Sequence, residues 1–199
     1  MDSFLLCLIL VALIALGGRE QVMVAQLSDA LAVRAGPILQ RPVPLLATGI
    51  ACAALSTAAM TWAAGAIAGL LPPRAAWMLV AFALALAAAE LGWAAIVRPR
   101  RTAPPREPTR AFGAIAIVLL WRQLGDGARF VIFAFAAQAT YPLTALLGGA
   151  LGGAIAVGAG WMLGAEALAR WPLRWIRLTL AAGLIVAALF IGLDARYGV

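Results

Sequence analysis

Apolar residues run along the chain in six long stretches, two of which are interrupted by short polar segments. The stretches cover residues 3–33, 43–71, 75–97, 111–139, 141–169 and 175–193. A transmembrane helix needs roughly 20 mostly apolar residues to cross the hydrocarbon core. The pattern therefore predicts an all-α integral membrane protein with six transmembrane helices.

The polar breaks lie in the first and fourth stretches. The fourth carries Arg122, Asp126 and Arg129 beside two glycines, and the first carries a shorter version around Arg19 and Glu20. A charge inside the bilayer is costly, so it usually faces a protein interior or a water-filled path. Interrupted spans at corresponding places in two halves are the strongest sequence sign of a transporter's binding site. We therefore expect broken first and fourth helices that carry the functional site.

The two halves of the chain resemble each other when the sequence is shifted by about 100 residues. The matching positions are Pro42 and Pro142, Gly49 and Gly149, Pro72 and Pro172, Arg74 and Arg174, and Gly92 and Gly192. This self-similarity divides the chain into a three-helix repeat (residues 1–97), an arginine- and proline-rich linker (98–110) and a second three-helix repeat (111–199). Three spans per half place the second repeat upside down relative to the first, which gives an inverted 3+3 repeat.

Arginines are concentrated in the loops after the first, third and fifth stretches. Ten of the 15 basic residues lie there: Arg34, Arg41, Arg98, Arg100, Arg101, Arg106, Arg110, Arg170, Arg174 and Arg177. The opposite loops hold only Arg74 and Arg196. By the positive-inside rule the linker is cytoplasmic and both termini are periplasmic. The lack of lysine and the many alanines and arginines indicate a GC-rich bacterial genome, so we expect the bacterial inner membrane.

Composition excludes several functional classes. The chain is 65% hydrophobic, with a mean hydropathy of +1.00 and a formal charge of +7. The arginines are explained by topology, so no nucleic-acid partner is expected. Cys7 and Cys52 lie in apolar runs and are expected to be buried thiols. With no histidine, no close cysteine pair and no nucleophile beside a base, we expect neither a zinc site nor an enzyme, and no cofactor.

At the two breaks the sequence resembles the GDT family of transmembrane Ca²⁺/Mn²⁺:H⁺ antiporters, as a divergent member. The family carries Glu-x-Gly-Asp-(Lys/Arg)-(Thr/Ser) once in each inverted half, often followed by glutamine. The first copy falls on Ala15, Gly17, Gly18, Arg19, Glu20 and Gln21, and the second on Gln123, Gly125, Asp126, Gly127, Ala128 and Arg129. One of the four family acids, Asp126, stands in its place.

The resemblance implies exchange of Mn²⁺ or Ca²⁺, as transported ions, for protons. Hard cations prefer carboxylate, amide and carbonyl oxygens. The candidate ion-binding residues are Asp126, Gln123, Glu20, Gln21, Gly125 and Gly17, with Asp126 and Glu20 as the metal-binding carboxylates. Arg19, Arg122 and Arg129 are expected to line the site.

Three alternatives remain open. The charges at the breaks form a purely structural ion-pair network, with Asp126 neutralising Arg122 or Arg129. The arginines bind an anion or zwitterion as cargo. In the third alternative, the chain is a non-transporting membrane scaffold or regulator. Away from the breaks, Asp29 and Arg34 are expected to be solvated at a loop edge, and Glu90 and Glu166 to be interfacial.

Overall fold

The computed structural model describes residues 2–35, 38–96 and 111–198, and within them the fold is all-α apart from one small hairpin. The eight helices are α1 (Asp2–Ile14), α2 (Arg19–Leu31), α3 (Val43–Ala68), α4 (Pro73–Ile96), α5 (Phe112–Leu124), α6 (Gly127–Gln138), α7 (Pro142–Arg170) and α8 (Leu173–Tyr197). The expected linker, residues 98–110, lies outside the described residues.

The helices confirm a multi-pass membrane protein. Four of them, α3, α4, α7 and α8, are long and apolar enough to cross a bilayer. The helices α1 and α2 pass the same test together and are bent by 63° at their break, which gives five candidate spans if the pair is one broken span and not a re-entrant loop. The shorter apolar helices α5 and α6 are separated only by residues 125–126. Both predicted breaks are therefore present as gaps between helices.

Proline and glycine set the helix boundaries where the sequence predicts them. Pro142 stands at the start of α7, where its missing N–H costs nothing. Gly69 follows the last residue of α3, and α4 begins at Pro73. Gly198 ends α8 in the left-handed conformation that glycine adopts without strain.

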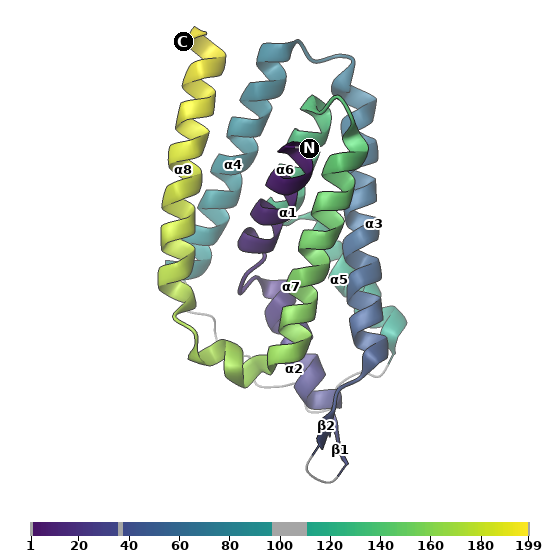
Figure 1. Cartoon of the computed structure of the whole chain (residues 1–199). Helices are drawn as coiled ribbons and strands as arrows, with labels where there is room; N and C mark the ends of the chain where they lie inside the picture. Colours follow the sequence, from purple (N-terminus) through teal and green to yellow (C-terminus); the bar gives the residue numbers. More distant parts are fainter. Residues whose placement is uncertain (1, 36–37, 97–110, 199) are drawn as a thin grey trace.

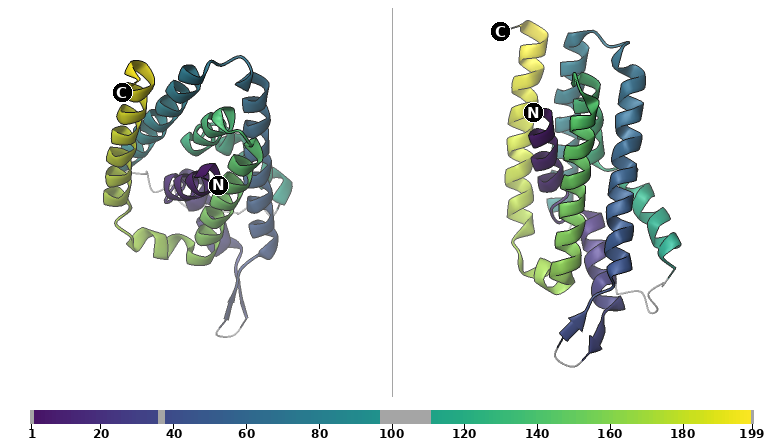
Figure 2. Two further views of the ribbon diagram at one scale, coloured as in Figure 1. Left: turned by 45° about the horizontal axis from the view of Figure 1, so that its top comes forward. Right: turned by 45° about the vertical axis from the view of Figure 1, so that its right-hand side comes forward.

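The long helices alternate in direction and surround the shorter ones. In Figure 1, α3 and α8 run upward whereas α4 and α7 run downward; α1 and α2 descend, and α5 and α6 ascend. The helices α1 and α6 lie inside the bundle (Figure 2). Both α1 and α2 pack against α7, both α5 and α6 pack against α3, and α4 packs along α8.

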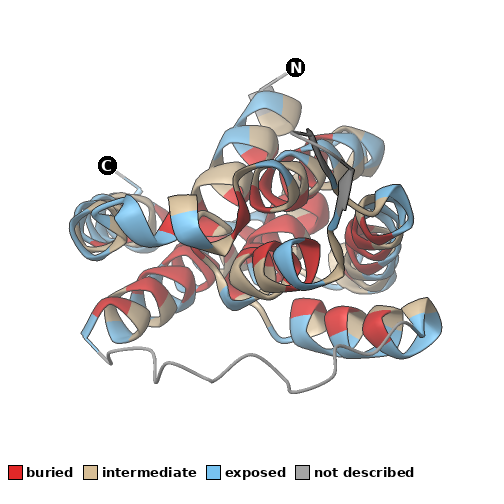
Figure 3. Cartoon of the chain, turned by 90° about the horizontal axis from the view of Figure 1, so that it is seen from below, coloured by how far each residue is buried: buried red, intermediate tan, exposed pale blue. Residues whose placement is uncertain are grey.

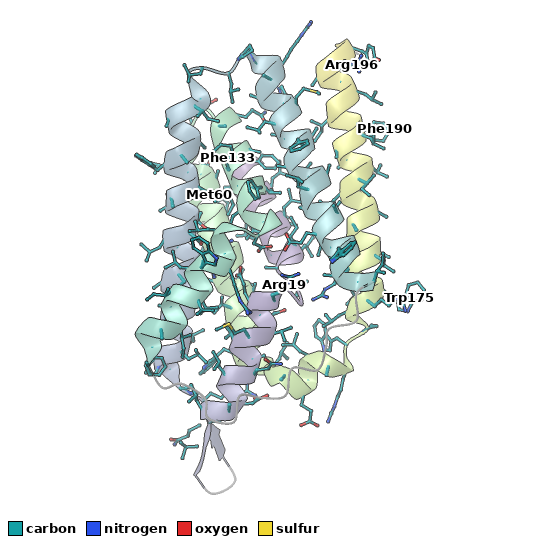
Figure 4. All side chains as sticks on the ribbon, turned by 180° about the vertical axis from the view of Figure 1, so that it is seen from behind. Arg19, Met60, Phe133, Trp175, Phe190 and Arg196 are labelled. Atoms are coloured by element: carbon teal, nitrogen blue, oxygen red, sulfur yellow. The ribbon has the colours of Figure 1, made fainter. Side chains whose placement is uncertain are left out.

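The core lies between these helices. Buried positions gather on the inward faces, especially on α6, in which nine of twelve residues are buried (Figure 3). Large apolar side chains such as Trp62, Phe82 and Phe190 are exposed on the outer surface, at 79%, 63% and 73%. An apolar exterior of this kind suits lipid. Arg19 lies near mid-height in Figure 4, whereas Arg196 lies at one end.

Two elements were not predicted from the sequence. Residues between α2 and α3 form an antiparallel hairpin of β1 (Val33–Ala35) and β2 (Ile38–Gln40), in which Val33 pairs with Gln40. In addition, α7 is interrupted at Gly164, whose φ of 73° and ψ of 173° lie outside the helical region. Neither feature changes the apolar pattern of the chain, so hydropathy alone does not reveal it.

Candidate functional site

The first break is held together by glutamine and glycine. Gly17 has a φ of 68°, a left-handed conformation that favours glycine. Its N–H donates to Oε1 of Gln21 at 2.5 Å, and Nε2 of Gln21 donates to the carbonyl of Ala156 on α7 at 3.1 Å. The predicted site residues Gly17 and Gln21 therefore shape the break and fasten it to α7.

The second break is held by a residue from another helix. Asp126 is the residue before α6, but its side chain makes no capping hydrogen bond. Instead, the N–H of Gly127 donates to Oε2 of Glu90 on α4 at 2.6 Å. A Cβ on Gly127 would lie 2.8 Å from Cα of Ala87, so glycine allows α4 to approach this closely. A carboxylate at a helix N-terminus satisfies a free N–H and suits the helix dipole.

Glu90, and not Asp126, caps α6, and the Asp126 carboxyl group lies near other acids. It lies within hydrogen-bonding reach of Glu90 and interacts electrostatically with Glu20 and Arg129. A hydrogen bond between two carboxyl groups needs a proton on one of them. Glu20, Glu90 and Asp126, from α2, α4 and the α5–α6 break, are called the carboxyl cluster below.

Gln123 adds a buried amide side chain beside Glu20. The residue is fully buried, and its Oε1 accepts a hydrogen bond from Oγ of Ser56 at 3.0 Å. The Gln123 side chain also lies within hydrogen-bonding reach of Glu20. Among the described residues, Nε2 of Gln123 and Oε1 of Glu20 have no partner beyond each other. Buried polar atoms need partners, so these two side chains depend on each other and on the groups of the site around them.

The three break arginines have different surroundings. Arg129 is 1% exposed and donates from Nε to Oγ of Ser56 at 2.8 Å. Arg19 is exposed, as is Arg122, whose Nη1 lies 3.7 Å from Sδ of Met23. Within the described residues none of the three forms an ion pair with an acid within 4.0 Å. The structure therefore does not show the direct pairing of Asp126 with Arg122 or Arg129 that the structural alternative requires.

Glu90 is the main site residue that the sequence reading missed. It was expected at the interface, yet it lies partly buried between α4 and α6 and completes the carboxyl cluster. A single glutamate inside a 24-residue apolar helix is a usable signal, because such a charge is costly without a partner. Ser56 was also missed, and only its position among the buried hydroxyls of α3 points to it.

Asp29 is not merely a solvated charge at a loop edge. Its Oδ2 accepts the N–H of Ala165 at 2.7 Å, just after the interruption of α7, and its Oδ1 lies 3.5 Å from Nη2 of Arg41. Glu166 does remain at the surface and pairs with Arg170 at 2.6 Å. The side chain of Arg34 lies outside the described residues. Asp29 therefore links α2 to α7.

Side chains of the described residues do not by themselves form a complete set of metal ligands. Among the described residues no group of three or more histidine, cysteine, aspartate or glutamate side chains is placed to hold a metal ion. Gly125 is exposed at the end of α5. A bound cation would therefore need backbone carbonyl, amide or water oxygens in addition to the carboxyl cluster.

Comparison with known proteins yields no match to a family model, to a curated protein or to a solved structure.

Proposed function

We propose that the chain is a secondary transporter whose cargo binds at the carboxyl cluster. The observation that carries this proposal is the meeting of Glu20, Glu90 and Asp126, from three separate elements, inside a bundle of membrane-crossing helices. Acids in such surroundings usually mark ion or proton pathways. The buried Gln123 side chain beside Glu20 adds amide atoms to the same place.

We further propose that the bundle is an inverted 3+3 repeat of six spans. In this arrangement α1 and α2 form one broken span, and α5 and α6 form its counterpart in the second half. Each half then has one broken span followed by two long helices, and corresponding helices of the two halves run in opposite directions (Figure 1). Repeats of this kind place the cargo site where broken helices meet near the midplane.

The proposed cargo is a small cation exchanged for protons, as the likeness of the breaks to the GDT motif implies, with Mn²⁺ and Ca²⁺ as the first candidates. Carboxylate oxygens of Asp126 and Glu20 suit hard cations, and freed carbonyls at the breaks would supply further oxygens. Proton exchange is supported because carboxyl groups that bind a cation can take up protons in its place.

A second candidate cargo is an anion or zwitterion. It is favoured by one observation: Arg129 is buried and has no acid within 4.0 Å in the described part of the chain. A guanidinium binds carboxylate and phosphate groups through several N–H donors at once. The carboxyl cluster beside it would repel such a cargo, so we place this candidate second.

The proposed location is the bacterial inner membrane, with the arginine-rich ends of the helices in the cytoplasm. The turn between α7, which ends at Arg170, and α8 lies at the lower end of the bundle in Figure 1, whereas the turn before α4 and the end of α8, near Arg196, lie at the upper end. Positive charge is retained on the cytoplasmic side of bacterial membranes. The upper end would then face the periplasm.

The test is ion flux into liposomes that contain the purified protein under an imposed pH gradient. We expect uptake of Mn²⁺ or Ca²⁺ that depends on the gradient and falls at least tenfold in Asp126→Asn, because the variant loses a charged ligand. Glu166→Gln, a change at the exposed acid of α7, serves as the matched control and should leave flux unchanged.

Either of two results would contradict this proposal. Full flux in Asp126→Asn would remove the carboxyl cluster from the mechanism. No flux of either cation in the wild-type protein would favour the anion candidate, or a scaffold or regulator that transports nothing.

A further inference from the structure

Arg129 occupies a compartment built for its guanidinium group. It lies in the first turn of α6 and is among the largest side chains that are fully buried. Ser56 on α3 accepts a hydrogen bond from its Nε at 2.8 Å. On α7, Gly153 leaves the space open, since a Cβ there would lie 3.3 Å from Nη2 of Arg129. Two helices thus fix the arginine in place.

The charge of this arginine is balanced at a distance. Arg129 interacts electrostatically with Glu20 and Asp126, but neither acid approaches within the 4.0 Å of an ion pair. Elsewhere in the described chain the ion pairs are direct: Arg41 with Asp29 at 3.5 Å and Arg170 with Glu166 at 2.6 Å. A buried charge needs a counter-charge, because burial removes it from water. Arg129 therefore relies on the carboxyl cluster for its counter-charge but forms no direct ion pair with it.

The other charged groups around the cluster do not play this part. Arg19 and Arg122 are exposed, so packing does not fix their guanidinium groups, although Arg122 also interacts electrostatically with Glu20. On α8, Arg177 donates from Nη1 to the carbonyl of Ala94 at 3.2 Å, toward the end of α4. Within the described residues, Arg129 is the cation that is both buried and coupled to Glu20 and Asp126.

We propose that Arg129 is a tethered cation, a fixed positive charge that balances Glu20 and Asp126 while the site is empty and weakens the binding of divalent cations. This role rests on the proposed function, because it concerns the selectivity of the same site. An arginine suits it since its guanidinium stays protonated and the Ser56 hydrogen bond holds it in place.

Charge determines the direction of the selectivity. Repulsion from a fixed positive charge is twice as large for a divalent as for a monovalent cation at the same distance. For a divalent ion about 8 Å away, at an effective dielectric of about 20, the repulsion corresponds to more than a hundredfold in affinity. Arg129 thus lowers the affinity of the site for Mn²⁺ and Ca²⁺, so that the proposed cargo binds less tightly than it would to the carboxyl cluster alone.

The experiment measures thermal unfolding of the full chain in detergent micelles against CaCl₂, MnCl₂ and NaCl at constant ionic strength. In Arg129→Gln we expect an apparent Kd for Ca²⁺ and Mn²⁺ at least tenfold lower than in the wild type. The ion-free variant should melt at a lower temperature and regain stability when either ion is added, since the ion replaces the lost charge. Arg129→Lys keeps the charge and should retain the wild-type response to the ions.

Controls separate this role from a purely structural one. Arg174→Gln removes an exposed arginine of α8 and should leave both the melting temperature and the ion response unchanged. If Arg129→Gln lowers the melting temperature equally with and without the ions, the arginine is structural and the proposal is overturned. If Arg129→Gln folds neither when purified alone nor when purified with Ca²⁺ or Mn²⁺, the proposal is overturned as well.

Liposome flux distinguishes failure of this inference from failure of the proposed function. Wild-type cation flux together with an unchanged ion affinity in Arg129→Gln would overturn only the role of Arg129. Absence of flux and of ion binding in wild type and Arg129→Gln alike would overturn both.

Discussion

At the scale of single residues, Glu90 combines two roles that different variants separate. Glu90→Gln keeps an oxygen that accepts the N–H of Gly127, so we expect nearly wild-type stability. Glu90→Ala removes that acceptor and should lower the free energy of unfolding by about 1–2 kcal/mol, the usual cost of a lost cap. Both variants should lose at least tenfold in cation flux, because each removes one carboxyl group of the cluster.

Denaturant unfolding and liposome flux, measured on the same preparations, check this prediction, with Glu166→Gln as the control. Wild-type flux in Glu90→Gln would mean that Glu90 only caps α6. A loss of stability in both variants to the same degree would mean that its charge, and not its hydrogen bond, holds the helix.

Single residues also mark the limit of reading the site from sequence. Asp126, Glu20 and Gln123 were predicted because charged and amide groups inside apolar runs are costly, and they do lie together. The positions of Glu90 and Ser56 in the site depend on how α4 and α3 pack against the breaks. Sequence spacing within one helix carries no information on such packing.

At the scale of elements, the interruption of α7 depends on Gly164. Its φ and ψ of 73° and 173° fall in a region that is essentially restricted to glycine. Asp29 caps the N–H of Ala165 from α2, and Arg41 donates to the carbonyl of Trp161 on the other side of the interruption. The hydrogen bonds that α7 loses at this point are thus partly replaced by neighbouring elements.

We therefore expect Gly164→Ala to lower the free energy of unfolding by about 1–3 kcal/mol, through backbone strain. Its Cβ would also meet the Asp29 carboxylate. Gly158→Ala on the same helix has nothing within 4 Å of the added atom and should be neutral or stabilising by up to about 1 kcal/mol. Denaturant unfolding in micelles measures both, and equal stability of the two variants would contradict the strain at Gly164.

The helix boundaries could be predicted better than the features inside and between the helices. Prolines and glycines stand close to the observed ends of α3, α4 and α7. The hairpin of β1 and β2 instead rests on local strand pairing, and the interruption at Gly164 is bridged by Asp29 and Arg41 from other elements. The hydrogen bond from Nε1 of Trp161 to the carbonyl of Pro42, at 3.0 Å, joins those two regions across 119 positions of sequence.

At the scale of the whole molecule, the arrangement of arginines makes the orientation testable. The turn between α3 and α4 lies at the upper end of the bundle in Figure 1, and the turn between α7 and α8 at the lower end. Leu70 is 80% exposed at the first turn and Trp171 is 45% exposed at the second. A cysteine at either position would report which side of the membrane it faces.

We expect a membrane-impermeant maleimide to label Leu70→Cys in intact bacterial cells, and Trp171→Cys only after the cells are permeabilised, in a background with Cys7 and Cys52 replaced by alanine. The reason is that, in the proposed orientation, the arginine-rich lower end faces the cytoplasm. Both substitutions leave every arginine in place, so the charge distribution that sets the orientation is unchanged.

Labelling of Trp171→Cys alone in intact cells would indicate the opposite orientation. Labelling of both would indicate an even number of membrane crossings between the two turns, which contradicts the proposed three. Because α4 and the broken pair α5–α6 lie between these turns together with α7, the same result tests whether α5 and α6 cross as one span.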